Sequence, residues 1–140
     1  PQPVAGLGAT QEPRAWLFDQ SIVVADDIRD AKGNLIAARG TKVNPLGLVQ
    51  LKTDLVFVDG RDPAQIAWAT SKWESTKAKI IFVAGSPFDR MGEYKRRFFF
   101  DQQGKLTQHF GISHVPAVVS QEGEALRIQE LLAPKPKGGA

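Results

Sequence analysis

Cysteine is absent from the 140 residues, and histidine is scarce, with only His109 and His114. Without cysteine the chain cannot form disulfides, a CxxC redox centre, a thiol nucleophile or thiolate zinc ligands. No stretch approaches the ~18 consecutive apolar residues of a membrane-spanning helix. Basic residues exceed acidic ones by only three and are spread along the chain, which disfavours a nucleic-acid-binding protein. The first ten residues lack the basic start and apolar stretch of an export signal, so we expect either a cytosolic protein or one whose signal was removed.

What the chain does contain is enough apolar material for one core. Hydrophobic residues make up 42% of the sequence and include eight Phe and three Trp. Both ends, in contrast, are rich in Pro and Gly, which predicts a flexible linker over 1–14 and a flexible tail over 133–140. We therefore expect the folded part to lie between these two segments.

The folded part divides into a β-hairpin module over 15–50 and an α/β domain over 51–132. In the module, the β-branched run 21–24 is predicted to pair with 35–39 across a turn at 30–34. In the domain, the apolar runs 54–59 and 79–83 have the composition of buried parallel strands. Helices are predicted over 63–75, with Asp62 as the cap and Pro63 in the first turn, and from Ser86 to about Tyr94.

The second half of the domain completes a mixed sheet. Residues 97–101 predict a short edge strand, and the following helix is expected to bury Leu106, Phe110 and Ile112 and to end at Gly111. The segments 117–119 and 125–131 are close enough to form an antiparallel hairpin. The fold class predicted from this order is α/β with a mixed sheet.

The element order resembles the thioredoxin fold. The segment F-G-I-S-H-V-P-A-V-V, 110–119, is similar to the thioredoxin segment in which a helix ends and a cis-proline precedes a strand. The resemblance implies that Val115-Pro116 is cis. At the position of the thioredoxin CxxC this chain has Gly60, Arg61, Asp62 and Pro63, so the family's redox chemistry is absent.

A second resemblance is more specific and covers 16–131. Its motifs are W-L-F-D at 16–19, D-I-R-D-A at 27–31, G-T-K-V-N-P at 40–45, F-V-D-G-R-D-P-A-Q-I-A-W at 57–68, and F-D-Q-Q-G-K-L-T-Q-H-F-G-I-S-H-V-P-A at 100–117. In this order they resemble the TraW family, periplasmic components of F-type conjugative type IV secretion systems. The resemblance implies a non-catalytic scaffold needed for pilus assembly and DNA transfer, without a cofactor, membrane insertion or direct contact with nucleic acid. It also implies a TrbC-like protein and other conjugation components as partners, and a signal peptide and N-terminal segment before residue 1, which makes this chain the C-terminal, thioredoxin-like part.

Two kinds of residue could carry chemistry instead. Asp59, Asp62, Asp19 and Asp101 end predicted strands or begin helices, where carboxylates can bind magnesium or act as a general base. This is the basis of the alternative hypothesis, an oxidoreductase-derived or metal-dependent enzyme that uses an Asp59/Asp62 crevice. Helix capping and turn formation explain the same residues, and no Gly-rich phosphate loop accompanies them. The two histidines flank the Gly111 helix stop without a third ligand, so surface or capping roles are favoured.

Two partner surfaces are predicted. The first is a groove that the resemblance to thioredoxin places between the turn with Gly60 and Arg61 and the segment with Ser113, His114 and Val115. The second lies around Tyr94 and Phe99, because the alternating run 98–100 must point at least one ring away from the other two. Burial of these rings in the core alone explains the same run equally well. The basic run 95–97 beside these rings could also suggest single-strand binding, but a solvated helix end, with the phenylalanines in the core and an edge strand, is the favoured explanation.

Overall fold

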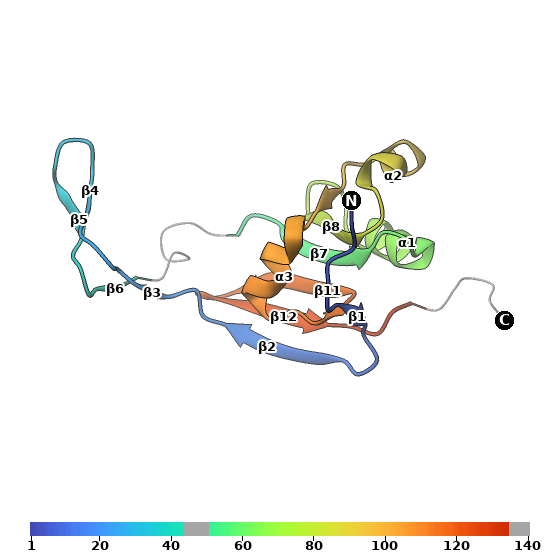
Figure 1. Ribbon diagram of the computed structural model, residues 1–140, viewed down its shortest axis with the longest axis horizontal. Helices are drawn as coiled ribbons and strands as arrows, with labels where there is room; N and C mark the ends of the chain where they lie inside the picture. The colour runs from blue at the N-terminus through green and yellow to red at the C-terminus, as the bar shows by residue number, and fades with distance from the viewer. Residues whose placement is uncertain (44–50, 135–140) are drawn as a thin grey trace.

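The computed structural model describes residues 1–43 and 51–134, and a six-stranded mixed sheet forms its centre (Figure 1). The strands lie in the order β2, β12, β11, β7, β8, β9. Their bounds are Arg14–Phe18 (β2), Ala125–Glu130 (β12), Ala117–Glu122 (β11), Asp54–Asp59 (β7), Ala78–Ala84 (β8) and Phe99–Phe100 (β9). The strands β7, β8 and β9 are parallel, and the other neighbours are antiparallel. The predicted mixed α/β architecture is therefore confirmed, with β7 inside the sheet and β9 at its edge.

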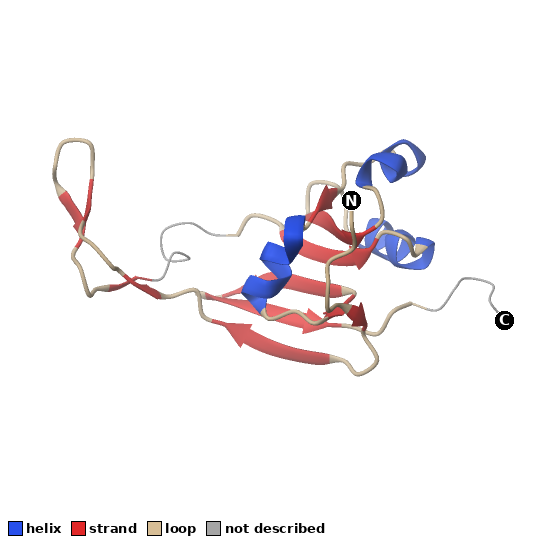
Figure 2. Cartoon of the chain, viewed as in Figure 1, coloured by secondary structure: helices blue, strands red, loops and turns tan. Residues whose placement is uncertain are grey.

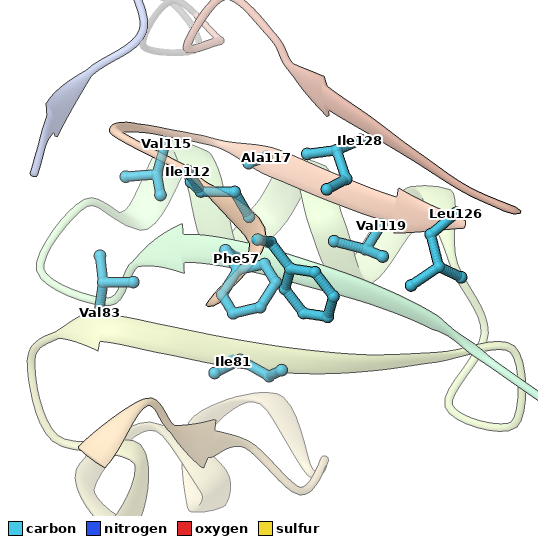
Figure 3. Close-up of a cluster of buried hydrophobic side chains, with 10 residues drawn as sticks. Phe57, Ile81, Val83, Ile112, Val115, Ala117, Val119, Leu126 and Ile128 are labelled. Atoms are coloured by element: carbon cyan, nitrogen blue, oxygen red, sulfur yellow. The ribbon is translucent and has the colours of Figure 1, made fainter. Parts of the chain in front are cut away.

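The centre of the sheet is buried on both faces because β7 and β8 contain the unbroken apolar runs 55–58 and 80–84. Alternate residues of β7 and β8 enter two clusters: Phe57 and Ile81 point to one face, whereas Val56 and Phe82 point to the other. Figure 3 shows the first cluster, with Phe57 between Ile81 and the β11 side chains. The end of the helix that precedes β11 covers the first cluster. The helix that follows β7 covers the second cluster.

Three helices flank this sheet (Figure 2). The helix α1 (Pro63–Lys72) begins with Asp62 accepting from the Ala64 N–H, and α2 (Pro87–Tyr94) begins with Ser86 as its cap, as predicted. A 3-10 turn over Gln102–Gly104 leads into α3 (Lys105–Phe110), which ends at Gly111 in the left-handed region with φ of 75°. The helix α1 packs on the Val56 face and α3 on the Phe57 face. The Val115-Pro116 bond is cis, as the resemblance implied.

The prediction that Leu106 of α3 is buried in the core is wrong. Leu106 is 39% exposed, and Thr107 is buried in its place. The buried carboxylate of Asp101 fixes this rotation, because it accepts the N–H groups of Leu106 and Thr107 and the Thr107 hydroxyl at 2.8–3.0 Å. A polar cap, rather than the apolar stripe, therefore sets which face of α3 is buried.

The N-terminal segment is not the linker that its composition predicted. The strand β1 (Gly8–Ala9) pairs in parallel with β10 (His114–Val115), and Arg14 begins β2 inside the main sheet. Val4 and Leu7 pack against the Phe57 face. The main-chain bonds of β1 and these two aliphatic contacts hold a segment whose Pro and Gly content indicated disorder. The proposed division of the chain into domains stays a prediction.

Residues 22–43 form an arm that extends away from the sheet (Figure 1). Its strands are β3 (Ile22–Val23) with β6 (Lys42–Val43), and β4 (Ile28–Arg29) with β5 (Leu35–Ala37). The predicted pairing of 21–24 with 35–39 is therefore wrong. The carboxylate of Asp30 accepts the N–H groups of Lys32 and Asn34, which closes a tight turn directly after β4 and makes β4 the partner of β5. The end of the predicted module, 44–50, and the tail 135–140 lie outside the described residues.

Candidate functional site

The loop after β7 brings together the first group of predicted site residues. Arg61 donates from Nε and Nη2 to the two carboxylate oxygens of Asp59, at 3.0 and 2.9 Å. Burial acts to raise the pKa of Asp59, but these bonds and the Arg61 N–H outweigh it and lower that pKa. Asp62 caps α1. Both carboxylates of the Asp59/Asp62 crevice are thus bonded within their own loop.

Gly60 occupies a position that no other residue fits. A Cβ atom at this position would lie 2.2 Å from Cδ2 of Phe82 and 2.6 Å from the carbonyl oxygen of Ala84. The Gly60 N–H donates to that same carbonyl at 2.8 Å. The glycine lets the loop that carries Arg61 lie flat against β8, and its carbonyl accepts from Arg90 of α2 at 3.3 Å. The structural role predicted for Gly60 has this contact as its physical basis.

The opposite wall of the predicted groove is the segment Ser113–Val115, and the chain's own N-terminus lies against it. The Gly8 N–H donates to the Ser113 carbonyl at 3.2 Å, and the Thr10 N–H donates to the Val115 carbonyl at 2.8 Å. A cavity of about 110 Å³ separates Leu7 and its neighbours from Asp59 and Arg61. The structure therefore brings Arg61 and Val115 to one groove, and residues 3–4 and 7–9 line it as well.

Sequence reasoning missed the most highly connected charged group, Glu130. The Glu130 side chain is 0% exposed. Its carboxylate accepts hydrogen bonds from the Arg14 guanidinium and from the N–H groups of Ser113 and His114. One carboxylate oxygen lies 3.1 Å from Nδ1 of His114. Burial acts to raise the pKa of Glu130, but the bonds from Arg14 and the Ser113–His114 segment overcome it and lower that pKa to about 2. The signal was present, because Glu130 continues the alternation of the buried residues Leu126 and Ile128 along β12.

Glu130 forms the floor of an open hollow. The hollow has a volume of about 620 Å³ and is bordered by Gly8, Arg14 and His114. Both oxygens of the Glu130 carboxylate accept hydrogen bonds from protein groups, so this carboxylate links β2, β12 and the segment at β10. His114 and Ser113 are exposed at its rim, whereas the Val115 side chain is buried.

The remaining predicted site residues do not gather. His109 packs its ring against Phe18 and Phe110, away from the contact that His114 makes. Asp19 lies in a turn, where hydrogen bonds from the Ser21 hydroxyl and the Ser21 N–H lower the pKa of Asp19. Among the residues in 1–43 and 51–134, no three His, Asp or Glu side chains lie close enough to hold a metal ion.

The second predicted surface is divided by the sheet edge. Tyr94 packs on the Val56 face and makes an edge-on contact with Phe98, whereas Phe99 packs on the Phe57 face beneath Arg97. The prominent exposed ring is one that sequence reasoning did not single out: Phe88 of α2 is 83% exposed. Its place directly after Pro87 at the helix start put it outside the apolar stripe of Met91 and Tyr94.

Further exposed apolar side chains lie on the arm. Val23, Ile28, Leu35 and Ile36 are all exposed, on strands with only one neighbour each. Within the described part of the chain, no helix is long and apolar enough to cross a membrane. Among the described residues, five of the eight exposed large hydrophobic side chains therefore lie on α2 and the arm, and the other three are Leu17, Leu106 and Leu132.

Comparison with known proteins gives one relationship. The chain is 42% identical over 121 residues to Protein TraW of Escherichia coli (strain K12), a match that covers 86% of this chain. This chain spans 58% of the length of that curated relative. No family model and no solved structure matches. The identity covers most of the sheet, the helices and the arm, and on this basis the chain belongs to the TraW family.

Proposed function

We propose that this chain is part of a periplasmic assembly protein of an F-type conjugative type IV secretion system. In this proposal it serves pilus assembly and DNA transfer by binding proteins, a TrbC-like partner first among them, and it catalyses no reaction. The observation that carries the proposal is the 42% identity to TraW over 86% of the chain. The assignment of the sheet to a thioredoxin-like fold belongs to the same proposal, and the order β8, β7, β11, β12 with helices on both faces supports it.

The surface chemistry supports binding as the mode of action. A large aromatic side chain exposed on a rigid helix is the type of residue that contributes most to protein interfaces. Phe88 has this character, and the Arg90 bond to Gly60 fixes its helix to the sheet. The arm adds aliphatic side chains that its own two-stranded sheets leave exposed. We therefore place the first partner contact on α2; the arm, which lies far from α2 along the long axis of the molecule (Figure 1), offers a separate apolar surface.

The groove residues Arg61, Ser113, His114 and Val115 form the second candidate contact. Arg61 could make charge-assisted bonds with a partner carboxylate, although it must first leave Asp59. The main chain beside Pro116 could pair with a partner strand. Tyr94 and Phe99 lie half-buried at the sheet edge, so they support the first contact rather than forming it.

Calorimetry with the TrbC-like protein of the same conjugation system tests this proposal. Phe88→Ala should weaken binding at least tenfold, because truncation of an anchoring aromatic costs ~2 kcal/mol or more. Leu132→Ala is the matched control, since Leu132 is also exposed but lies away from α2 and the arm. Arg61→Glu tests the groove. His114→Glu is not used, because it would place a second carboxylate beside Glu130. Absence of any binding by the folded wild-type chain would overturn the proposal.

A further inference from the structure

Residues 3–10 lie along the groove, with a turn at residues 5–6, where Gly6 has a φ of 80°, followed by the two-residue strand β1. Val4 donates its N–H to the Val83 carbonyl at 2.8 Å, at the end of β8. The main chain then continues to β1, which pairs with β10, and Thr10 closes the segment through its N–H to Val115 and its hydroxyl to the Pro116 carbonyl at 3.4 Å. Figure 1 shows this path, from the N-terminus near β8 to β1. The segment thus bridges β8 and β10.

The body has specific positions for the side chains of this segment. Val4 and Leu7 are half-buried against the Phe57 face. A Cβ at Gly104 would lie 2.6 Å from Cγ1 of Val4, so glycine at this position of the body makes room for the valine. At Gly8 the nearest atom to an added Cβ is Cδ2 of His114, at 3.8 Å. The groove therefore selects aliphatic side chains at two positions three residues apart and accepts a small residue after the second.

The segment is held loosely despite this fit. Its pairing with β10 spans two residues. Cavities of about 110 Å³ and 270 Å³ lie between it and the body, the first toward Arg61 and the second toward α3. Ordering the main chain of residues 3–10, including Gly6 and Gly8, costs conformational entropy that few bonds and two half-buried side chains must offset. Segments with this balance open at low free energy and can be replaced.

We propose that this groove is a strand-accepting site for a partner protein, and that residues 3–10 are its resident strand, displaced when the partner binds. The partner supplies an uncharged segment that turns between two aliphatic side chains three residues apart and is extended from a glycine or another small residue onward, as residues 4–9 are here. Its main chain pairs with β10, as in other cases of strand addition. The inference rests on the proposed function for the existence of a protein partner, and it specifies how that partner binds.

A second copy of this chain is the less favourable occupant. Only residues 11–13 separate Thr10 from Arg14, and Arg14 is anchored by two bonds to Glu130. Three extended residues span at most about 10 Å, so an exchanged segment would have to reach a second molecule across a very short connection. A segment from another protein carries no such constraint.

A labelled peptide with the sequence of residues 2–11 provides the test, titrated into the full chain. In Val4→Asp/Leu7→Asp the resident strand carries two charges that the groove disfavours, whereas the groove itself is unchanged. This variant should bind the peptide at least tenfold more tightly than the wild type, because the resident no longer competes. A chain with the exposed control substitution Leu132→Asp should bind like the wild type, and a peptide carrying the same two Asp residues should not bind. Equal affinities for the wild type and the double variant, with folding verified by circular dichroism, would overturn the proposal.

A reversible lock provides the second measurement. Because the chain has no cysteine, Gly8→Cys/His114→Cys introduces a single possible disulfide between residues that are register partners of β1 and β10. The oxidised protein should not bind the peptide and should bind the TrbC-like protein at least tenfold more weakly, because only the contact on α2 remains, and reduction should restore both. Binding by the locked protein at wild-type strength would contradict strand exchange, and disulfide-linked dimers would assign the site to a second copy instead.

Competition separates this inference from the proposed function. The TrbC-like protein should displace the peptide from Val4→Asp/Leu7→Asp. If it binds without displacing the peptide, the strand-accepting site is wrong as a partner site while the proposed function stands. If the peptide binds and the TrbC-like protein does not bind at all, the site exists and the proposed partner is wrong.

Discussion

Arg14 and Glu130 are 116 positions apart in the sequence and form a two-bond ion pair across the register of β2 and β12. The Nε–Oε1 distance is 2.7 Å and the Nη2–Oε2 distance is 3.0 Å. The same carboxylate accepts two N–H groups from the segment that leads into β10. This pair therefore connects the first strand of the sheet, its last strand and the edge of the groove.

The buried carboxylate of Glu130 predicts that the chain loses stability in acid. Its pKa is lowered in the folded state from 4.5 to about 2, so the folded form binds the proton less readily than the unfolded chain does. The stabilisation is complete above pH 4.5 and is lost as the pH falls toward 2, by an amount on the order of 3 kcal/mol. Urea denaturation at pH 7, 4.5 and 2.5 measures this loss. Glu130→Gln cannot titrate and should lose less stability over the same interval; parallel losses in both proteins would refute the assignment.

Gly60 should tolerate no side chain. Gly60→Ala places a Cβ atom within 2.6 Å of the β8 main chain and closer still to the Phe82 ring, so the loop must move. The expected loss in the free energy of unfolding is about 2 kcal/mol or more. Gly92→Ala is the matched control, because a Cβ at Gly92 of α2 has no neighbour within 4 Å and alanine favours helix by ~1 kcal/mol. Similar melting temperatures for the two variants would show that the close approach at Gly60 is not real.

Asp101 should contribute more to stability than an ordinary helix cap. Asp101→Ala leaves the N–H groups of Leu106 and Thr107 without their acceptor and the Thr107 hydroxyl with only the Gly104 carbonyl, which is expected to cost about 3 kcal/mol. The exposed Asp89, in the first turn of α2, is the comparison, and Asp89→Ala should cost under ~1 kcal/mol. Denaturant titration of both variants gives the two values. A cost for Asp101→Ala as small as that for Asp89→Ala would mean that the cap does not fix the rotation of α3.

The elements that the sequence predicted well are those fixed by local signals. Asp62-Pro63 and Ser86-Pro87 marked two helix starts, Gly111 marked a helix end, and the uniformly apolar run of β7 marked a buried strand. The errors arose where a distant partner decides. Residues 3–10 are ordered by β10, more than one hundred positions away, and the buried face of α3 is set by Asp101.

The candidate site was predicted only in part, because distant partners form some of it as well. The resemblance to thioredoxin implied that Arg61 and the 113–116 segment border one groove, and in the structure Arg61 and Val115 line one cavity. Sequence alone could not indicate that the chain's own N-terminus lies in that groove, because parallel pairing of two-residue strands leaves no periodic pattern. Phe88 was missed because an exposed aromatic has no signature that distinguishes it from a buried one in a short helix.

The central claim is tested most directly by measuring conjugative transfer. The donor cell produces the protein that contains this chain in place of its own TraW-family protein. Two variants are compared at equal protein levels, Asp62→Asn, which keeps the α1 cap, and Phe88→Asp, which places a charge on the exposed ring position. If the protein acts by binding partners, Asp62→Asn transfers DNA at the wild-type frequency and Phe88→Asp lowers the frequency at least tenfold. Loss of transfer in Asp62→Asn with full transfer in Phe88→Asp would contradict a binding function and indicate that the carboxylate takes part in chemistry.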